Sequence, residues 1–170
     1  VWAAQAASAS NGCVDFSSPA VEPFVAGPVV DSAGHILAVS ASATPEVFLR
    51  QFTYDGGVGT SWGPILLGEQ LLAQPSVSAT DACWVPADDA GARSLEEVAS
   101  DGSAGASITL PGANASAAAI LSDGDLVLSV GSYLRRFSPT GTARWAPPPP
   151  PARRRRARAA RPRRRRRHPA

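Results

Sequence analysis

The amino-acid sequence predicts an all-β fold, built from about three four-stranded antiparallel units and followed by a disordered C-terminal tail. Two observations support this prediction. One pattern of short apolar segments and glycine turns occurs three times in the first 146 residues. Its period of about 40–50 residues is typical of propellers and solenoids, in which each repeat is one small supersecondary unit. The tail, by contrast, contains only Ala, Pro, Arg and His, and such a segment cannot build a core.

The clearest copy occupies approximately residues 27–67, and we place its strands near residues 29–30, 36–40, 47–53 and 60–67. Gly34 and the cluster 55–57 stand where hairpins require a positive φ, which glycine adopts without steric cost. Phe48 and Phe52 point to one face of the third strand, whereas Leu49 points to the other. A strand that is apolar on both faces is covered on both faces, as in blades that stack around a central axis. We therefore predict a partial β-propeller.

The second copy, approximately residues 74–110, is degenerate but runs without a gap through its second half. Its segment Ser94 to Val98 falls 46 positions after Phe48 to Phe52, and Ile108 takes the place of Trp62. By the same alignment Cys83 takes the place of Ile36, in a strand.

The third copy, approximately residues 117–146, is shorter and has two residues fewer in its final turn. Such drift is compatible with a repeat because loops absorb changes of length at low cost. Across the copies we expect these residues to hold equivalent structural positions in the blades: Gly34, Phe48, Phe52, Trp62, Phe137, Gly141 and Trp145.

The repeated pattern reads Asp-x-x-Gly-x-hydrophobic, then acidic-x-Phe-hydrophobic-x-Arg-hydrophobic, then Gly-x-x-x-Trp. It resembles bacterial propeller repeats, namely the seven-bladed β-propeller repeat family and its pyrroloquinoline-quinone-type relatives, over about residues 20–146. The resemblance implies that a tryptophan closing each blade packs against the neighbouring blade, and Trp62 and Trp145 match that position. We expect both to be buried. The first copy departs from the pattern because Gly59 precedes Trp62 by only three residues, and the second has lost the tryptophan.

Three blades do not close a propeller, which typically has four to eight. The sequence begins at Val1 and contains no Met, so we expect an internal piece of a longer bacterial protein. Residues 1–20 are then a remnant of a preceding blade or a linker, and residues 21–146 carry the repeats. We expect an exported protein, located outside the cell, in the periplasm or at the cell surface, with no membrane-spanning segment.

The tail, residues 147–170, contains eleven of the sixteen arginines, whereas all fourteen acidic residues precede it. The body therefore carries a net charge of about −9 and the tail +11. Three interpretations remain open. The tail binds nucleic acid or another polyanion, it is a solvated basic tail, or it results from translation in the wrong frame of a GC-rich gene.

No catalytic, cofactor or metal site emerges from the sequence. The segment 59–63 matches the Gly-x-Ser-x-Gly pattern of a nucleophile elbow, but the only downstream histidine is His168 in the tail. His35 has no second histidine or cysteine nearby in the repeats. The acidic pairs Asp88–Asp89, Glu96–Glu97 and Asp123/Asp125 lack the spacing of a calcium loop, and we assign them to turns and solvated faces.

Cys13 and Cys83 allow one disulfide, although a buried free thiol at Cys83 is the simpler expectation. The resemblance implies a non-catalytic scaffold or protein-interaction module that binds a protein through its propeller loops. One alternative is a piece of a quinoprotein dehydrogenase, which requires inward-facing polar residues from many blades and a calcium ligand set. The other is polyanion binding through the tail.

Overall fold

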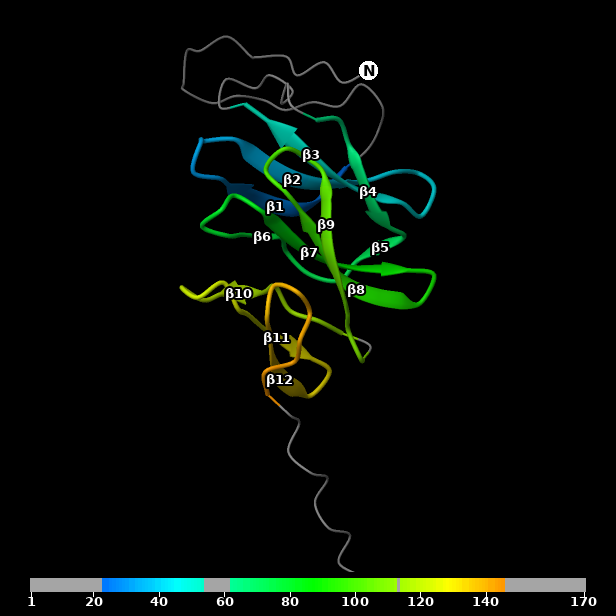
Figure 1. The fold of residues 1–170 in the computed structure, drawn as a ribbon. Coiled ribbons are helices and arrows are strands. Elements are labelled where there is room, and N and C mark those ends of the chain that lie inside the picture. The colour runs from blue at the N-terminus through cyan, green and yellow to red at the C-terminus, as the bar shows by residue number, and fades with distance from the viewer. Residues whose placement is uncertain (1–22, 54–61, 113, 146–170) are drawn as a thin grey trace, which may run out of the picture.

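The computed structural model describes residues 23–53, 62–112 and 114–145, and this part of the chain contains twelve β-strands and no helix. The strands form three antiparallel sheets that lie one above another, and none of the sheets is closed (Figure 1). The predicted all-β, partial-propeller fold is therefore confirmed. The predicted N-terminal linker and the arginine-rich tail lie outside the described residues.

The first sheet has the order β1-β2-β3-β4, with β1 at Phe24–Val30, β2 at Ile36–Ala41, β3 at Val47–Phe52 and β4 at Ile65–Gly68. β1 is longer than predicted because two register shifts keep it paired with β2 as far back as Phe24. β4 begins later than predicted, at Ile65. The residue before it is Pro64, which has no N–H to donate to a ladder.

The second sheet contains β5 (Gln70–Leu71), β6 (Ser76–Val77), β7 (Cys83–Asp89), β8 (Ala92–Val98) and β9 (Ala104–Thr109). Its order is β5-β7-β8-β9, and β6 also pairs with β7, so the first strand of this unit consists of two short pieces. The third sheet has the order β10-β11-β12, with β10 at Ala119–Ile120, β11 at Leu126–Val130 and β12 at Tyr133–Phe137.

The strand register repeats from sheet to sheet. In each sheet, the first residue of the second strand pairs with the last residue of the first strand on one side. On the other side it pairs with the last residue of the third strand. These trios are Val30–Ile36–Phe52, Val77–Cys83–Val98 and Ile120–Leu126–Phe137. Cys83 therefore does take the place of Ile36, as the alignment predicted. Phe137 likewise corresponds to Phe52.

Two apolar cores lie between the sheets. The first joins Leu37, Val39 and Leu49 of the first sheet to Cys83 and Val85 of the second. The second core joins the opposite face of the second sheet to the third sheet, through Trp84, Leu95, Ile108, Leu126, Leu128 and Phe137. Strand β7 is consequently buried on both faces along nearly its whole length. The prediction that the strands are covered on both faces is confirmed for this sheet.

In the second and third sheets, a glycine in the turn after the third strand contacts a side chain of the preceding sheet. The ring of Trp62 lies on Gly102, and its Nε1 donates a hydrogen bond to the Ser100 carbonyl at 3.2 Å. Ile108 lies against Gly141 in the corresponding place. Trp62 thus packs against the neighbouring sheet, although it is only half-buried.

Two details of the predicted alignment are wrong. In backbone register Ile65, and not Trp62, corresponds to Ile108, because Ile65 pairs with Leu49 and Ile108 pairs with Leu95. The first unit's outer strand starts only after Pro64, so Trp62 is equivalent to Ile108 only in the turn glycine that its side chain contacts. Trp145 is 43% exposed rather than buried. No described residue lies beyond the third sheet to cover it.

Candidate functional site

The turns between the first and second strands form one rim of the stack, at the left in Figure 1. They span Asp31–His35, Ser78–Ala82 and Leu121–Asp125 and share the same two backbone hydrogen bonds. The fourth residue of each turn has a positive φ, namely Gly34 at 84°, Asp81 at 61° and Gly124 at 84°. Gly34 therefore has the left-handed conformation for which the sequence analysis selected it.

The first two of these turns are bound to each other. The Ser32 backbone N–H donates to Asp81 Oδ1 at 2.7 Å, and the Ser32 hydroxyl donates to Asp81 Oδ2 at 2.6 Å. These two hydrogen bonds, the side-chain bond first, lower the pKa of the Asp81 carboxyl because they stabilise its ionised form. The first and second sheets are thus joined at the rim.

The same bridge is missing between the second and third turns. Ala79 stands where Ser32 stands in the first turn, and Gly124 stands where Asp81 stands in the second, so neither the hydroxyl nor the carboxylate is present. A groove of about 320 Å³ opens at this point. It is lined by Ser78, Ala79, Thr80, Trp84, Glu97, Ile120, Leu121, Ser122, Asp123, Gly124 and Pro139.

The groove combines an apolar floor with polar walls. Trp84 belongs to the second core and Ile120 packs against it. The hydroxyls of Ser78, Thr80 and Ser122 lie on the two turns. Glu97 contributes a carboxylate whose Oε2 accepts the Ala106 N–H at 2.9 Å. This composition, with apolar surface and few convergent polar groups, is typical of binding clefts.

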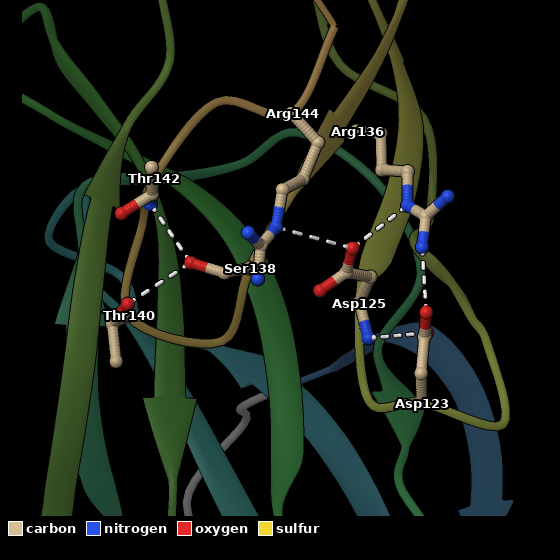
Figure 2. A network of polar contacts seen from close by, with 7 residues as sticks. All are labelled: Asp123, Asp125, Arg136, Ser138, Thr140, Thr142 and Arg144. Carbon is tan, nitrogen blue, oxygen red and sulfur yellow. Dashed lines mark hydrogen bonds and ion pairs between the residues drawn. The ribbon is translucent and has the colours of Figure 1, made fainter.

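Behind the third turn lies a network of charged side chains (Figure 2). Arg136 Nε contacts Asp125 Oδ2 at 2.7 Å, and its Nη2 contacts Asp123 Oδ2 at 2.6 Å. Arg144 Nε approaches the same Asp125 oxygen at 3.5 Å. Both aspartates lie in a turn, as predicted, but Asp125 is only 4% exposed, so the expectation of a solvated side chain is wrong for it. The cause is two arginines that neutralise it.

Of the other two acidic pairs, only Asp88–Asp89 divides in the same way. Asp88 is buried and contacts Arg93 Nε at 2.9 Å, whereas Asp89 is exposed. Glu96 and Glu97 are both half-buried, and both accept hydrogen bonds from β9, from the Ser107 hydroxyl and the Ala106 N–H respectively. At least one member of each pair therefore has a structural role that the sequence spacing did not indicate.

A short turn motif that the sequence analysis missed occurs at Ser42–Thr44, Ser78–Thr80 and Ser138–Thr140. In each the serine hydroxyl lies within 2.9 Å of the threonine hydroxyl two residues later. In the latter two turns the serine Oγ also accepts the N–H four residues on (Figure 2 for Ser138). The signal was available, because Ser-x-Thr is repeated in the sequence and such turns favour these hydroxyls.

Of the residues considered for catalysis, His35 lies within the described part of the chain. His35 Nδ1 contacts Asp31 Oδ2 at 2.8 Å, so the histidine is held within its own turn. The nearby Ser32 hydroxyl donates to Asp81 and not to His35, and a serine nucleophile requires the base as its partner. Of the segment 59–63, only Trp62 and Gly63 lie within the described residues.

Cys83 is buried and free, and burial raises the pKa of its thiol to about 12. It packs in the first core as a small apolar side chain, as expected. Cys13 lies outside the described residues. Within the described ranges, no group of three or more His, Cys, Asp or Glu side chains is arranged to hold a metal ion.

A second cavity, of about 460 Å³, lies on the face of the first sheet that is turned away from the second, and Ile36 and Phe52 contribute to its lining. Their counterparts Cys83 and Val98, and Leu126 and Phe137, belong to the cores between sheets. The cavity thus occupies a face whose equivalents in the other two sheets pack against a neighbouring sheet. We therefore take the groove of about 320 Å³ between the second and third turns, hereafter the rim groove, as the candidate site. Phe48, on the same face, is half-buried beneath the Arg50 guanidinium, 5.6 Å from its ring centre.

No protein-family model and no curated protein matches the sequence. Among solved structures, the fold is similar to a crystal structure of a protein of unknown function from Bacteroides caccae, with a TM-score of 0.54 and 16% sequence identity. The similarity covers 76% of this chain and 47% of that one, so the chain spans about half the length of the neighbour. This comparison shows the fold alone. No helix within the described ranges is long and apolar enough to cross a membrane.

Proposed function

We propose that this protein is a non-catalytic, propeller-type scaffold that binds a protein partner through the turn rim. The observation that carries the proposal is the groove between the second and third turns. It exists because the bridge that closes the rim between the first two turns, Ser32 to Asp81, is replaced by Ala79 and Gly124. The repeat thus departs from its own pattern at a place where apolar surface and hydroxyls meet.

The charge of the groove indicates the kind of side chain that it accepts. Glu97 and Asp123 line it, and its lining contains no Lys or Arg. Asp123 is paired with Arg136 through one oxygen, whereas the contact of Glu97 is to an uncharged backbone N–H. A basic side chain with an apolar stem satisfies both the carboxylate and the floor. We therefore assign the groove to an arginine or lysine of the partner.

The proposal is tested by closing the groove. The double substitution Ala79→Ser with Gly124→Asp restores at this site the pair that joins the first two turns, and Asp at position 124 adopts the conformation that Asp81 already has. The probes are the peptide Gly-Ser-Arg-Ser-Gly and its citrulline counterpart, which has the same shape without the charge. Binding is followed by amide chemical shifts of Thr80, Ser122 and position 124.

We expect saturable shifts at these amides with the arginine peptide, weaker ones with the citrulline peptide, and none in the double variant. The single variant Ser103→Ala, in an exposed turn elsewhere in the second sheet, is the matched control and should bind as the wild type does. Equal shifts in the wild type and the double variant, or no shifts in the wild type, would contradict the proposal.

The eleven arginines of the tail favour a second function, polyanion binding. Deleting residues 147–170 should abolish salt-sensitive binding to double-stranded DNA, because the remaining body is acidic. Retention of that binding by the truncated protein would refute this function.

A further inference from the structure

The third sheet lacks the outer strand that the other two possess. β4 covers β3 in the first sheet, and β9 covers β8 in the second. In the third sheet the corresponding contact is reduced to one bridge, between Phe137 and Ala143. Tyr133 and Leu134 of β12 are 47% and 61% exposed. Within the described residues β12 is an open edge.

The backbone groups at this edge can be identified from the register. The Arg136 carbonyl accepts the Arg144 N–H at 2.8 Å, so Arg136 directs its backbone polar groups outward. Because the direction alternates along a strand, Leu134 also directs its N–H and C=O outward. In the second sheet its equivalent, Leu95, pairs with Ile108 of β9.

A guanidinium nitrogen without a hydrogen-bond partner lies on the same strand. The Nε of Arg135 is buried and has no hydrogen-bond partner, although the guanidinium lies 5.9 Å from the Tyr133 ring centre. At the equivalent position in the first sheet, Arg50 Nε donates to the Ser40 hydroxyl at 2.7 Å. Val130 stands where Ser40 stands and cannot accept this bond. A carboxylate can therefore supply the hydrogen-bond partner that Arg135 Nε lacks.

We propose that β12 binds an extended strand of a partner protein, which adds to the third sheet antiparallel to β12. The strand carries an aliphatic residue opposite Leu134 and an acidic residue opposite Arg135. Strand β9 shows the pattern, since Ile108 stands opposite Leu95 and Ser107 opposite Glu96. Edge pairing supplies the main-chain hydrogen bonds, and the two side chains supply specificity. This inference goes beyond the rim groove and does not depend on it.

The probe is a hexapeptide with the β9 sequence in which the Ser107 position carries glutamate, Ala-Gly-Ala-Glu-Ile-Thr. Two control peptides carry lysine in place of the glutamate, or a methyl group on the isoleucine nitrogen. Affinities are measured by fluorescence anisotropy with the full-length protein. We expect the acidic peptide to bind at least about tenfold more tightly than the lysine peptide, as for a charge-assisted contact. Methylation should abolish binding because it removes a ladder donor.

Protein variants decide whether the contact is the one proposed. Arg135→Glu should reverse the preference in favour of the lysine peptide, and Arg135→Gln, which retains the side-chain length, should remove the discrimination. Leu66→Glu alters an equally exposed leucine, 56% exposed on β4, and should bind as the wild type does. The groove-closing double variant should also bind the acidic peptide normally, so the two proposals fail independently.

Three results would overturn the inference: no binding of the acidic peptide by the wild type, equal binding of the acidic and lysine peptides, or unchanged preference in Arg135→Glu. A concentration-dependent dimer that Leu134→Glu dissociates would assign the edge to a second copy of the chain instead.

Discussion

Three glycine-to-alanine substitutions measure how closely the sheets are packed at their turns. Gly102, Gly141 and Gly91 all have a positive φ, at 82°, 84° and 88°, so alanine at each costs about 1 kcal/mol or somewhat more in backbone strain. They differ in what the added methyl group meets. At Gly91 nothing lies within 4 Å, and at Gly141 Ile108 Cγ1 is 3.4 Å away. At Gly102 the methyl group would overlap Cβ and Cγ of Trp62.

We therefore expect Gly91→Ala to lower the free energy of unfolding by about 1 kcal/mol. Gly141→Ala should cost slightly more, because its methyl group is in ordinary contact. Gly102→Ala adds overpacking worth about 1–3 kcal/mol, for a total of about 2–4 kcal/mol. Urea unfolding followed by circular dichroism gives the three values. Since Gly91 controls for backbone strain, only the differences test the contact between sheets.

The reasoning is refuted if Gly102→Ala destabilises the protein no more than Gly91→Ala. That result would mean that Trp62 does not rest on the turn of the second sheet. A Trp62→Ala, Gly102→Ala double variant provides the converse check. It should lose less stability than the sum of the single variants, because the overlap disappears with the ring.

The remaining predictions concern ionisable groups. Asp125→Asn should lower the free energy of unfolding, measured by thermal unfolding, by about 2 kcal/mol because it leaves Arg136 without its buried partner. A decrease no larger than that caused by the exposed substitution Asp101→Asn would contradict this prediction. Ser32→Ala should destabilise the protein at pH 7 but not near pH 2, because the hydrogen bonds from Ser32 lower the pKa of Asp81 from 3.8 and stabilise the fold only while Asp81 is ionised. Equal shifts of the urea unfolding midpoint at both pH values would count against the bridge between Ser32 and Asp81. In a Cys13→Ser background, Cys83 should resist iodoacetamide at pH 8 until the protein unfolds, because burial raises the pKa of its thiol from 9.0 to about 12. The free energy of unfolding should therefore keep the full contribution of this thiol below pH 9.0 and lose it as the pH rises towards 12.

The parts of the fold that follow from local chemistry could be predicted from the sequence. Gly34 marks a turn whose φ only glycine adopts easily, and the apolar residues on both faces of the strands indicate stacked sheets. The equivalence of Cys83 and Ile36 followed from counting residues between such turns. Counting failed at Trp62, where the proline before β4 delays the outer strand by three residues relative to the second sheet.

The candidate site could not be predicted in the same way because it arises between units. Neither Ala79 nor Gly124 is unusual in its own turn, and the groove appears only when the two turns lie side by side. The open edge at β12 is also non-local, since it depends on what fails to pair with Leu134. The burial of Asp125 required knowing that Arg136 and Arg144 converge on it from another strand and the loop beyond.

Residue-resolved amide hydrogen exchange tests the central claim most directly, namely that three equivalent sheets are stacked and that the third ends in an open edge. Leu49, Leu95 and Leu134 occupy the same position in successive sheets. We predict that the amides of Leu49 and Leu95 exchange slowly and that of Leu134 rapidly, with β7 the most protected strand. Addition of the acidic hexapeptide should slow exchange at Leu134. Slow exchange of Leu134 in the free protein, or rapid exchange along β7, would contradict the account.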